Sequence, residues 1–411
     1  MVAMSDSRGV GAPAWNEPWT RAEGEERARA LFATVYDEEP TGAWSAPGRI
    51  NFVGDHTDYN GGLCLPAIIR HRAYVAGRAR PDAIVRISDG HDPARTIEIE
   101  IDAISEEVHH TWLGAAAGVV GAMVERGFTG PGLDLAVASC VPQRVGLAST
   151  AAFACATALA VNDLWRLALD TPALRVDLAE AAYDAESLVV GESIGRLNEY
   201  VSLFGSRHNA LLLDCSTSPP AMHDTVLSFR EHGLEVVVVD TGTTYGVADA
   251  GARRAECVAA TSALGARSLR EIADAPNGLS LVEALSDPIL RKRARHVITE
   301  IHRVRGVVDA LAGVGPAHER FVEAGRLISA SHASLAEDFE VSGPELDLAV
   351  EASQAAGALG AKLVGVGFGG AVIALVRRTA RATLVDSVDR AFADAGFPPP
   401  RYLLPYEFSA E

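Results

Sequence analysis

The order of apolar and polar positions predicts a loose N-terminal arm, then a helix, then a group of strands. Residues 1–21 are rich in Gly, Pro and Ser, which favour irregular backbone. Helical spacing of Ala28, Leu31 and Phe32 among charged residues predicts a helix over 22–35. Short apolar or alternating runs then predict strands over 43–53, 73–79, 83–87 and 96–101.

The middle of the chain has the pattern of buried helices. Spans 112–126 and 150–167 consist mostly of Ala, Gly, Val and Leu, so these helices are expected to pack on most sides, and a third helix follows over 174–190. Later strands are predicted over 210–214, 235–240, 361–365 and 371–376, with helices between them through 332. Because strands and helices do not alternate regularly, the pattern predicts an α+β fold rather than a doubly wound sheet.

Composition excludes whole classes of function. The chain has 411 residues, 48% of them hydrophobic, which suggests two domains with sizeable cores. Its net charge of −18 disfavours binding to nucleic acid or to anionic membranes. The sequence has no signal peptide or apolar span, and its five scattered cysteines form no CxxC pair. We therefore expect a cytoplasmic protein that acts on small molecules.

The first of three polar or glycine-rich loops, residues 46–62, reads APGRINFVGDHTDYNGG. It places Arg49, Asp55, His56 and Asp58 between apolar neighbours, and these side chains suit hydrogen bonds to the hydroxyl groups of a sugar. Two alternatives are a metal site formed by Asp55, His56 and Asp58, and a turn whose polar side chains bind its own backbone.

The second loop, VPQRVGLASTAA at 141–152, runs into a predicted helix that Ser149 or Thr150 can cap. Free N–H groups in the first turn of such a helix favour an anion, although helix starts of this kind are common. A Walker-type nucleotide site is excluded, because the chain has no GxxxxGK[ST] motif and only two lysines, Lys292 and Lys362.

The third loop, GVGFGG at 365–370, matches the GxGxxG pattern. A dinucleotide-binding fingerprint needs a helix after this pattern, whereas a strand is predicted here. We expect a tight strand–loop–strand that backs a neighbouring loop.

In this order, the three loops resemble the motifs of the GHMP kinases and, within them, of the galactokinases. The first loop resembles GRxNxxGEHxDYNxG, with Asp55 in place of the Glu. Segments 202–215, 331–335 and 339–347 also resemble that family, so the similarity extends over about residues 25–405. The resemblance implies an N-terminal α/β (ribosomal-S5-like) domain over 22–215 and a C-terminal ferredoxin-like α+β domain over 216–411.

The resemblance implies ATP and Mg2+ as cofactors and gives roles to individual residues. Arg49 matches the arginine that stabilises the transferring phosphoryl group, and Glu186 and Thr150 match residues that hold Mg2+. The positions that match sugar ligands are Asp55, His56, Asp58 and Gly195. Those that match the ATP-phosphate loop are Gly146, Leu147, Ala148, Ser149 and Thr150.

The predicted helix spacing gives Glu186 room for a cation. Ala182 and Ala179 lie at i−4 and i−7 from Glu186, so its stripe of the helix carries small side chains. The alternative is a surface glutamate. A separate stripe of carboxylates is expected to face solvent, formed by Asp177, Glu180 and Asp184.

The chain departs from the family at the active-site loop. The family reads GIMDQ, whose Asp is the proposed base, whereas residues 195–199 read GRLNE. Asn198 cannot accept a proton, and a positioned base typically contributes about 10²–10⁴ in rate. Phosphoryl transfer nevertheless depends mainly on positioning and electrostatics. Glu199, at the place of the family's Gln, is expected to point elsewhere if the local structure is a strand or helix; the alternative is that it replaces the base.

Two further departures concern the phosphates. The loop that resembles GxGLSSS loses one glycine and one serine, and its Arg144 either contacts phosphates or blocks the close approach that glycine allows. Val366 stands where the family has a small residue, which narrows the space beside the phosphates.

The leading functional hypothesis is an ATP-dependent kinase that converts galactose or a related aldose to its 1-phosphate, with Arg49 and Asn198 as catalytic residues. A sugar- and nucleotide-binding pseudokinase that acts as a sensor or regulator is the alternative, and a kinase for another polyol is a third. The resemblance implies a monomer or weak dimer.

Overall fold

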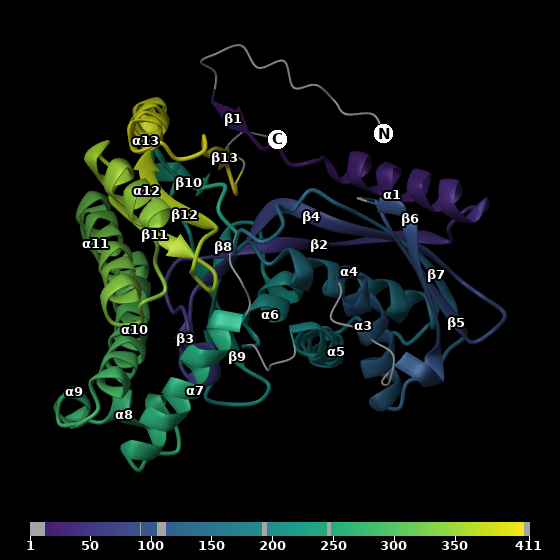
Figure 1. Cartoon of the computed structure of the whole chain (residues 1–411), viewed down its shortest axis with the longest axis horizontal. Helices are drawn as coiled ribbons and strands as arrows, with labels where there is room; N and C mark the ends of the chain where they lie inside the picture. The colour runs from purple at the N-terminus through teal and green to yellow at the C-terminus, as the bar shows by residue number, and fades with distance from the viewer. Residues whose placement is uncertain (1–12, 91, 105–111, 191–194, 245–247, 407–411) are drawn as a thin grey trace.

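The computed structural model describes residues 13–90, 92–104, 112–190, 195–244 and 248–406. In this part of the chain, two five-stranded sheets and one three-stranded sheet are covered by helices (Figure 1), which confirms the predicted α+β class. The helices are α1 (Arg21–Tyr36), α3 (Trp112–Glu125), α4 (Ser149–Leu164), α5 (Pro172–Val190), α6 (Leu197–Phe204), α7 (Ala248–Ala263), α8 (Leu269–Asp274), α9 (Gly278–Glu283), α10 (Pro288–Ala312), α11 (Ala317–Glu337), α12 (Pro344–Ala355) and α13 (Arg381–Ala395).

The first sheet has the strand order β2-β4-β7-β5-β6 and carries helices on both faces. Helix α1 packs on β4 and β7 through a small cluster that includes Phe32 and Tyr74, while α4 packs on β2 and β4 and is itself covered by α3 and α5. The strands are β2 (Gly42–Asn51), β4 (Pro66–Ala79), β5 (Ile84–Asp89), β6 (Asp92–Glu100) and β7 (Leu133–Ser139).

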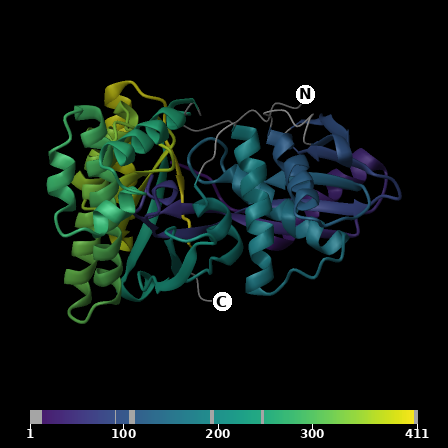
Figure 2. The ribbon, with the colours of Figure 1, turned by 90° about the horizontal axis from the view of Figure 1, so that it is seen from below.

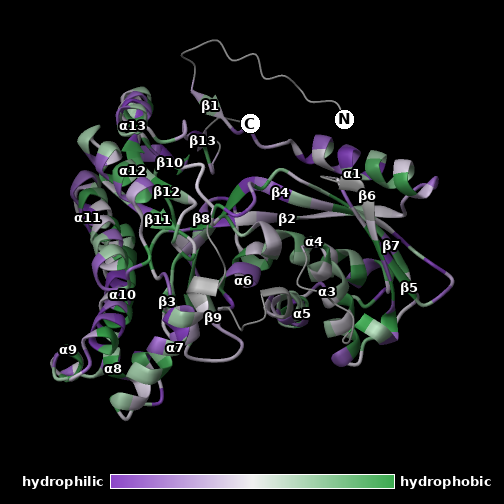
Figure 3. Cartoon of the chain, in the orientation of Figure 1, coloured by the Kyte–Doolittle hydropathy of each residue, from purple (hydrophilic) through white to green (hydrophobic). Residues whose placement is uncertain are grey.

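Helices α3 and α4 are buried along most of their length, as their apolar composition predicts. Gly118 of α3 lies so close to α5 that an added Cβ would be 3.1 Å from the Cβ of Ala185. The small residues therefore allow close helix packing. Helices α10 and α11, by contrast, carry hydrophilic and hydrophobic residues on different faces (Figure 3).

The second sheet has the order β1-β13-β10-β12-β11. Helices α10 to α13 gather on its side of the molecule, apart from α3 to α5 (Figure 2). Ala14 and Trp15, expected in the loose arm, instead pair in parallel with β13, and the Trp15 ring lies 5.5 Å from that of Tyr402. The strands are β1 (Ala14–Trp15), β10 (Leu234–Asp240), β11 (Gly360–Val364), β12 (Ala371–Arg377) and β13 (Arg401–Leu403).

The third sheet consists of β3 (Leu63–Cys64), β8 (Asn209–Asp214) and β9 (Ala221–Val226). Strands β8 and β9 pair on either side of the expected domain boundary after residue 215, which stays a prediction. None of the helices in the described ranges is long and apolar enough to cross a bilayer.

Strand β7 is an element that the sequence pattern missed. Its second residue, Asp134, is fully buried. Because a charged residue is not expected in a buried strand, Asp134 makes this strand hard to predict from the sequence pattern. The neighbouring strands supply the counter-charges, since the carboxylate accepts hydrogen bonds from Arg78, Arg80 and Arg86. Helices α12 and α13 were also not predicted.

Candidate active site

Arg49 lies near the end of β2 and joins two other segments. Its side chain is 7% exposed, and its Nε and Nη2 groups donate to Oδ1 of Asn198 over 3.0 and 2.7 Å. Its Nη1 group donates to the carbonyl of Gly146, and its backbone N–H donates to the carbonyl of Leu147 over 3.0 Å. The structure thus brings together Arg49, Asn198 and the second loop, which lie about 100 and 150 residues apart in the sequence.

The second loop has a strained backbone. Arg144, Gly146 and Ala148 have φ values of 60°, 83° and 58°, the left-handed region that side chains disfavour. A Cβ on Gly146 would lie 2.4 Å from the carbonyl oxygen of Val364, so glycine is required there. The loop is therefore fixed directly against the end of β11.

Helix α4 begins at Ser149, and the predicted cap by Ser149 or Thr150 is wrong. The N-cap residue is Ala148, whose methyl group cannot accept a hydrogen bond, and no side chain caps this end. Ser149 and Thr150 lie half-buried in the first turn instead. The first turn of α4 therefore has backbone N–H groups without a side-chain acceptor, which suits a phosphate.

The third loop connects β11 to β12 and backs the second loop, as predicted. A Cβ added to Gly365 would lie 2.6 Å from Cα of Gly146, and one on Gly370 would lie 2.8 Å from the carbonyl oxygen of Val145. Val366 lies half-buried in this turn. The strand on each side of the loop also confirms that it is not a dinucleotide-binding fingerprint.

Asp55 and His56 are buried in the first loop and have protein partners. Oδ2 of Asp55 accepts from Nζ of Lys362 over 2.6 Å, and that lysine is fully buried. Nδ1 of His56 lies 2.8 Å from the Tyr59 hydroxyl, whereas its buried Nε2 has no partner. Burial lowers the pKa of His56 to about 3, so its ring is neutral. These contacts do not favour a metal site at Asp55, His56 and Asp58, and the His56 ring also faces the backbone of Val366.

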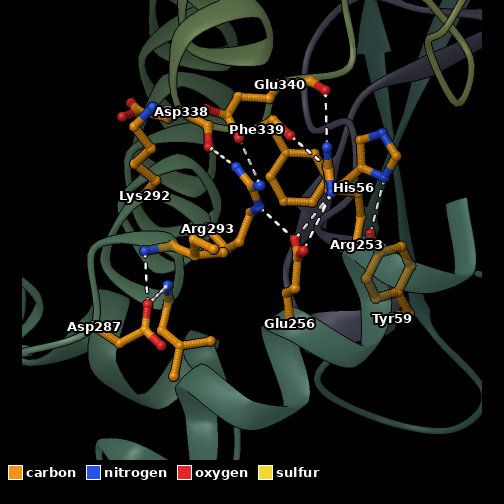
Figure 4. Close-up of polar contacts among 12 residues, drawn as sticks. His56, Tyr59, Arg253, Glu256, Asp287, Lys292, Arg293, Asp338, Phe339 and Glu340 are labelled. Atoms are coloured by element: carbon orange, nitrogen blue, oxygen red, sulfur yellow. Dashed lines mark hydrogen bonds and ion pairs between the residues drawn. The ribbon is translucent and has the colours of Figure 1, made fainter. Parts of the chain in front are cut away.

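A second layer of residues supports His56 (Figure 4). The Phe339 ring lies 4.4 Å from the His56 ring, and the Phe339 carbonyl accepts from Nε of Arg253 over 2.8 Å. The buried Arg293 pairs with both Glu256 and Glu340, which flank this contact. Phe339, in the segment 339–347 that resembles the family, therefore supports the first loop at His56.

Asp58 opens a short 3₁₀ turn, Asp58–Asn60, and lies against Gly195. A Cβ on Gly195 would be 1.5 Å from Oδ2 of Asp58, so this close approach requires glycine. Burial raises the pKa of Asp58, an effect that nearby backbone N–H groups and Arg49 oppose. The two predicted sugar-binding residues, Asp58 and Gly195, are therefore in direct contact, just before helix α6, which carries Asn198.

Glu186 and Glu199 form a buried pair of acidic side chains. Glu186 on α5 is 7% exposed, which rules out the surface alternative, and Glu199 on α6 is fully buried. As expected, the Glu199 side chain points away from Asn198, and no described contact links it to Arg49. Both carboxyl oxygens of Glu199 and Oε2 of Glu186 are buried without a hydrogen-bond partner. Burial, followed by the charge of Glu186, raises the pKa of Glu199 well above its ordinary value.

The sequence did not predict that the Glu199 and Glu186 side chains lie together. The position of Glu199, directly before the mostly apolar run YVSLF, could have indicated that it is buried. The expected solvent-facing stripe on α5 is also wrong for Glu180, which accepts from Nε of Arg196 and from the Tyr200 hydroxyl, over 2.9 and 2.8 Å. Asp184 pairs with Arg126, and its side chain is exposed as expected.

Glu300 on α10 is a buried residue that the sequence did not single out. Its Oε1 accepts from the backbone N–H of Gly54 over 2.8 Å and from the Ser331 hydroxyl over 2.7 Å. Its Oε2 accepts from Nε of Arg303 over 2.6 Å. Because Gly54 precedes Asp55, Glu300 holds the first loop in place. Burial opposes ionisation of Glu300, but Arg303 and other nearby cations outweigh it and lower its pKa to about 2.

We predict that Glu300→Gln destabilises the protein by about 3 kcal/mol at pH 7, the equivalent of its pKa shift from 4.5 to about 2. A lowered pKa stabilises the fold above pH 4.5, and this contribution is lost as the pH falls towards 2. Thermal unfolding between pH 3 and 7 should therefore show a smaller loss of Tm on acidification in the variant. The exposed Glu337→Gln is the control, and an unchanged acid response in Glu300→Gln would contradict the prediction.

Known proteins are similar to this chain in sequence and in architecture. Three protein-family models match it: the galactokinase galactose-binding signature over residues 30–79, the GHMP kinase N-terminal domain over 114–206 and the GHMP kinase C-terminal domain over 309–394. A galactokinase from Streptomyces coelicolor is 35% identical over 372 residues, which cover 90% of this chain and 93% of the relative. One from Mycobacterium tuberculosis is 36% identical over 367 residues, covering 88% and 96%.

Solved structures agree with these sequence matches. The Lactococcus lactis galactokinase complexed with galactose superposes with a TM-score of 0.78 at 27% identity, covering 93% of this chain and 97% of that one. The Methanococcus jannaschii mevalonate kinase has a TM-score of 0.60 at 15% identity, covering 88% and 96%, and this likeness concerns the fold alone.

Proposed function

The chain belongs to the galactokinase family of the GHMP kinases, and from this premise we propose that it transfers the γ-phosphoryl group of ATP to the anomeric hydroxyl of galactose or a related aldose. This proposal rests mainly on the position of Arg49, whose guanidinium bonds both to the second loop at Gly146 and to Asn198 at the start of α6. One side chain can thus align the two substrates.

Arg49 commits three of its five N–H groups to protein acceptors, so two remain for an oxygen of the transferring group. As the sugar oxygen bonds to phosphorus, the bond from phosphorus to the bridging oxygen of ADP breaks. The charge on the transferring group then lies beside a buried guanidinium. Asn198 orients the sugar hydroxyl, whose proton goes to solvent or to the phosphate.

The sugar pocket, in this proposal, lies between the first loop and Gly195. Nε2 of His56 and the carboxylate of Asp58 supply a hydrogen-bonding group each, and Asp55 contributes the oxygen that Lys362 leaves open. Neutral His56 can donate or accept there, which suits a hydroxyl. The first turn of α4, with Ser149 and Thr150, receives the ATP phosphates.

Mg2+ fits the buried acidic pair. Three carboxyl oxygens of Glu186 and Glu199 have no hydrogen-bond partner, and carboxylate oxygen is the ligand type that this cation prefers. We propose that Glu186, Glu199 and Thr150 hold it. When bound, Mg2+ neutralises charge on the β- and γ-phosphates.

Glu199→Gln is predicted to weaken Mg2+ binding on the order of 10- to 100-fold. Without metal, the same change should alter Tm little, because the raised pKa keeps Glu199 protonated and glutamine is likewise neutral. Calorimetric titration with MgCl₂ and thermal unfolding with and without Mg2+ measure both effects. Glu235→Gln, a buried carboxylate of β10, is the matched control, and equal Mg2+ affinity in wild type and Glu199→Gln would refute the assignment.

Release of ADP from purified protein, ATP and Mg2+ in the presence of a panel of aldoses tests the proposed function. We expect ADP release that depends on galactose or a related aldose, with a sugar 1-phosphate as product. A protein that binds galactose in calorimetry but releases no ADP with any aldose would refute the kinase proposal and favour the sensor.

A further inference from the structure

A groove with a volume of about 370 Å³ lies outside the candidate active site. It is bordered by β2, which is an edge strand of the first sheet, and by α4, α5 and α6. Neither Arg49 nor Asn198 lines it. Its size is within the range of small-molecule sites, which is about 300–1,000 Å³.

Arg72 of β4 lies in this groove without an acidic partner. Its Nε donates to Oγ of Ser45 over 3.1 Å and its Nη2 donates to the Ser45 carbonyl over 2.8 Å, both on β2. Among the described residues, no carboxylate lies within 4 Å of its guanidinium. Burial, together with the nearby Arg21 and Arg207, lowers the pKa of Arg72 to about 10.

Arg175, in the first turn of α5, is the second cation of the groove. Its Nε is buried without a hydrogen-bond partner, and no ion pair among the described residues includes it. For Arg72, whose guanidinium is largely buried, the lack of a counter-charge is costly, and an anion that accepts from Arg72 and also from Arg175 lowers that cost. Phosphate oxygens match the forked N–H geometry of arginine.

Two carboxylates, those of Asp163 and Asp170, also line the groove. Oδ2 of Asp163 accepts from Nε1 of Trp44 over 2.6 Å, and Nδ2 of Asn162 donates to Asp163 and to Asp170. These contacts hold the two carboxylates in place and leave lone pairs that can accept from hydroxyl groups. The carboxylates would repel a ligand that is anionic throughout, so they select one that is anionic at one end and hydroxylated at the other.

We propose that this groove binds a sugar phosphate, with the phosphate on Arg72 and Arg175 and the hydroxyl groups on Asp163 and Asp170 beside Trp44. The proposed anion site depends only on the residues that line the groove. The choice of a sugar phosphate as ligand rests on the proposed function, which makes such a compound.

Calorimetric titration with galactose 1-phosphate tests the proposal in an Arg49→Ala background, where the active site has lost its phosphate-binding side chain. Adding Arg175→Ala should weaken binding about 10- to 100-fold, as expected for lost hydrogen bonds to a charged group. Adding Arg326→Ala, which removes an exposed helix-surface pair with Glu323, should leave binding unchanged. Arg175→Gln serves if the alanine variant does not fold, and Arg72 is left intact because it braces β2.

Equal binding with and without Arg175→Ala would overturn the site, and so would loss of all binding in Arg49→Ala alone. Inorganic phosphate is the partial probe and should bind more weakly than galactose 1-phosphate. Equal affinity for inorganic phosphate would overturn the hydroxyl contacts. Because no turnover is measured, a failure of the proposed kinase activity would leave these results interpretable.

Discussion

An Arg49→Ala enzyme is expected to turn over about 10³- to 10⁵-fold more slowly than the wild type, the range by which an arginine at a transferring phosphoryl group raises kcat. The side chain is 7% exposed and holds Gly146 and Asn198 at once. Alanine therefore removes both the charge that stabilises the transition state and the contact that aligns the two loops.

The matched variant is Arg49→Lys, which keeps the charge but loses the fork that bonds to Asn198 through two nitrogens. Initial rates at saturating ATP and sugar should place Arg49→Lys between the wild type and Arg49→Ala. The main effect should be on kcat, while KM for the sugar changes less. An Arg49→Ala enzyme within tenfold of the wild-type kcat would show that Arg49 only supports the structure.

Asn198→Asp is expected to raise kcat by about 10²- to 10⁴-fold, the usual contribution of a positioned base. Oδ1 of Asn198 already accepts from Arg49, so an aspartate can keep this contact with one oxygen and offer the other to the sugar hydroxyl. The rate of the variant should also rise with pH until the carboxylate is ionised, a profile that the amide of the wild type lacks.

Two companion variants separate a new base from a change in local charge. Asn198→Ala removes the acceptor for Arg49 and should fall below the wild type. The double variant Asn198→Asp, Glu199→Gln has a carboxylate at the proposed sugar site and none at position 199, the proposed Mg2+ ligand. It should keep the gain in kcat at saturating Mg2+. An unchanged or lower kcat in Asn198→Asp would mean that proton removal does not limit this enzyme and that positioning dominates the barrier.

The sequence was sufficient where the signal was local. The apolar runs on each side of GVGFGG predicted the β11–loop–β12 hairpin, and the Ala-rich span after 150 predicted α4, because periodicity and small residues report directly on local structure. The order of the three loops also pointed to the family, because it depends on residue identity alone.

Long-range contacts were beyond the reach of such patterns. Asp134 hides β7 in the sequence, because its charge is balanced by arginines from two neighbouring strands. Asp55 and Lys362 are 307 positions apart and form a buried pair. The hydrophobicity pattern of a short segment carries no information about a partner so far away in the sequence. A buried charged residue whose charge is balanced by such a partner therefore looks like a surface residue.

By itself, therefore, the sequence determined the α+β class, the three loops and the family, since these depend on local periodicity and on residue identity. Only the tertiary structure decided which charges meet: Arg49 with Asn198, Asp55 with Lys362 and Glu186 with Glu199. Electrostatic interactions depend on distance and burial, and both arise only when the chain is folded.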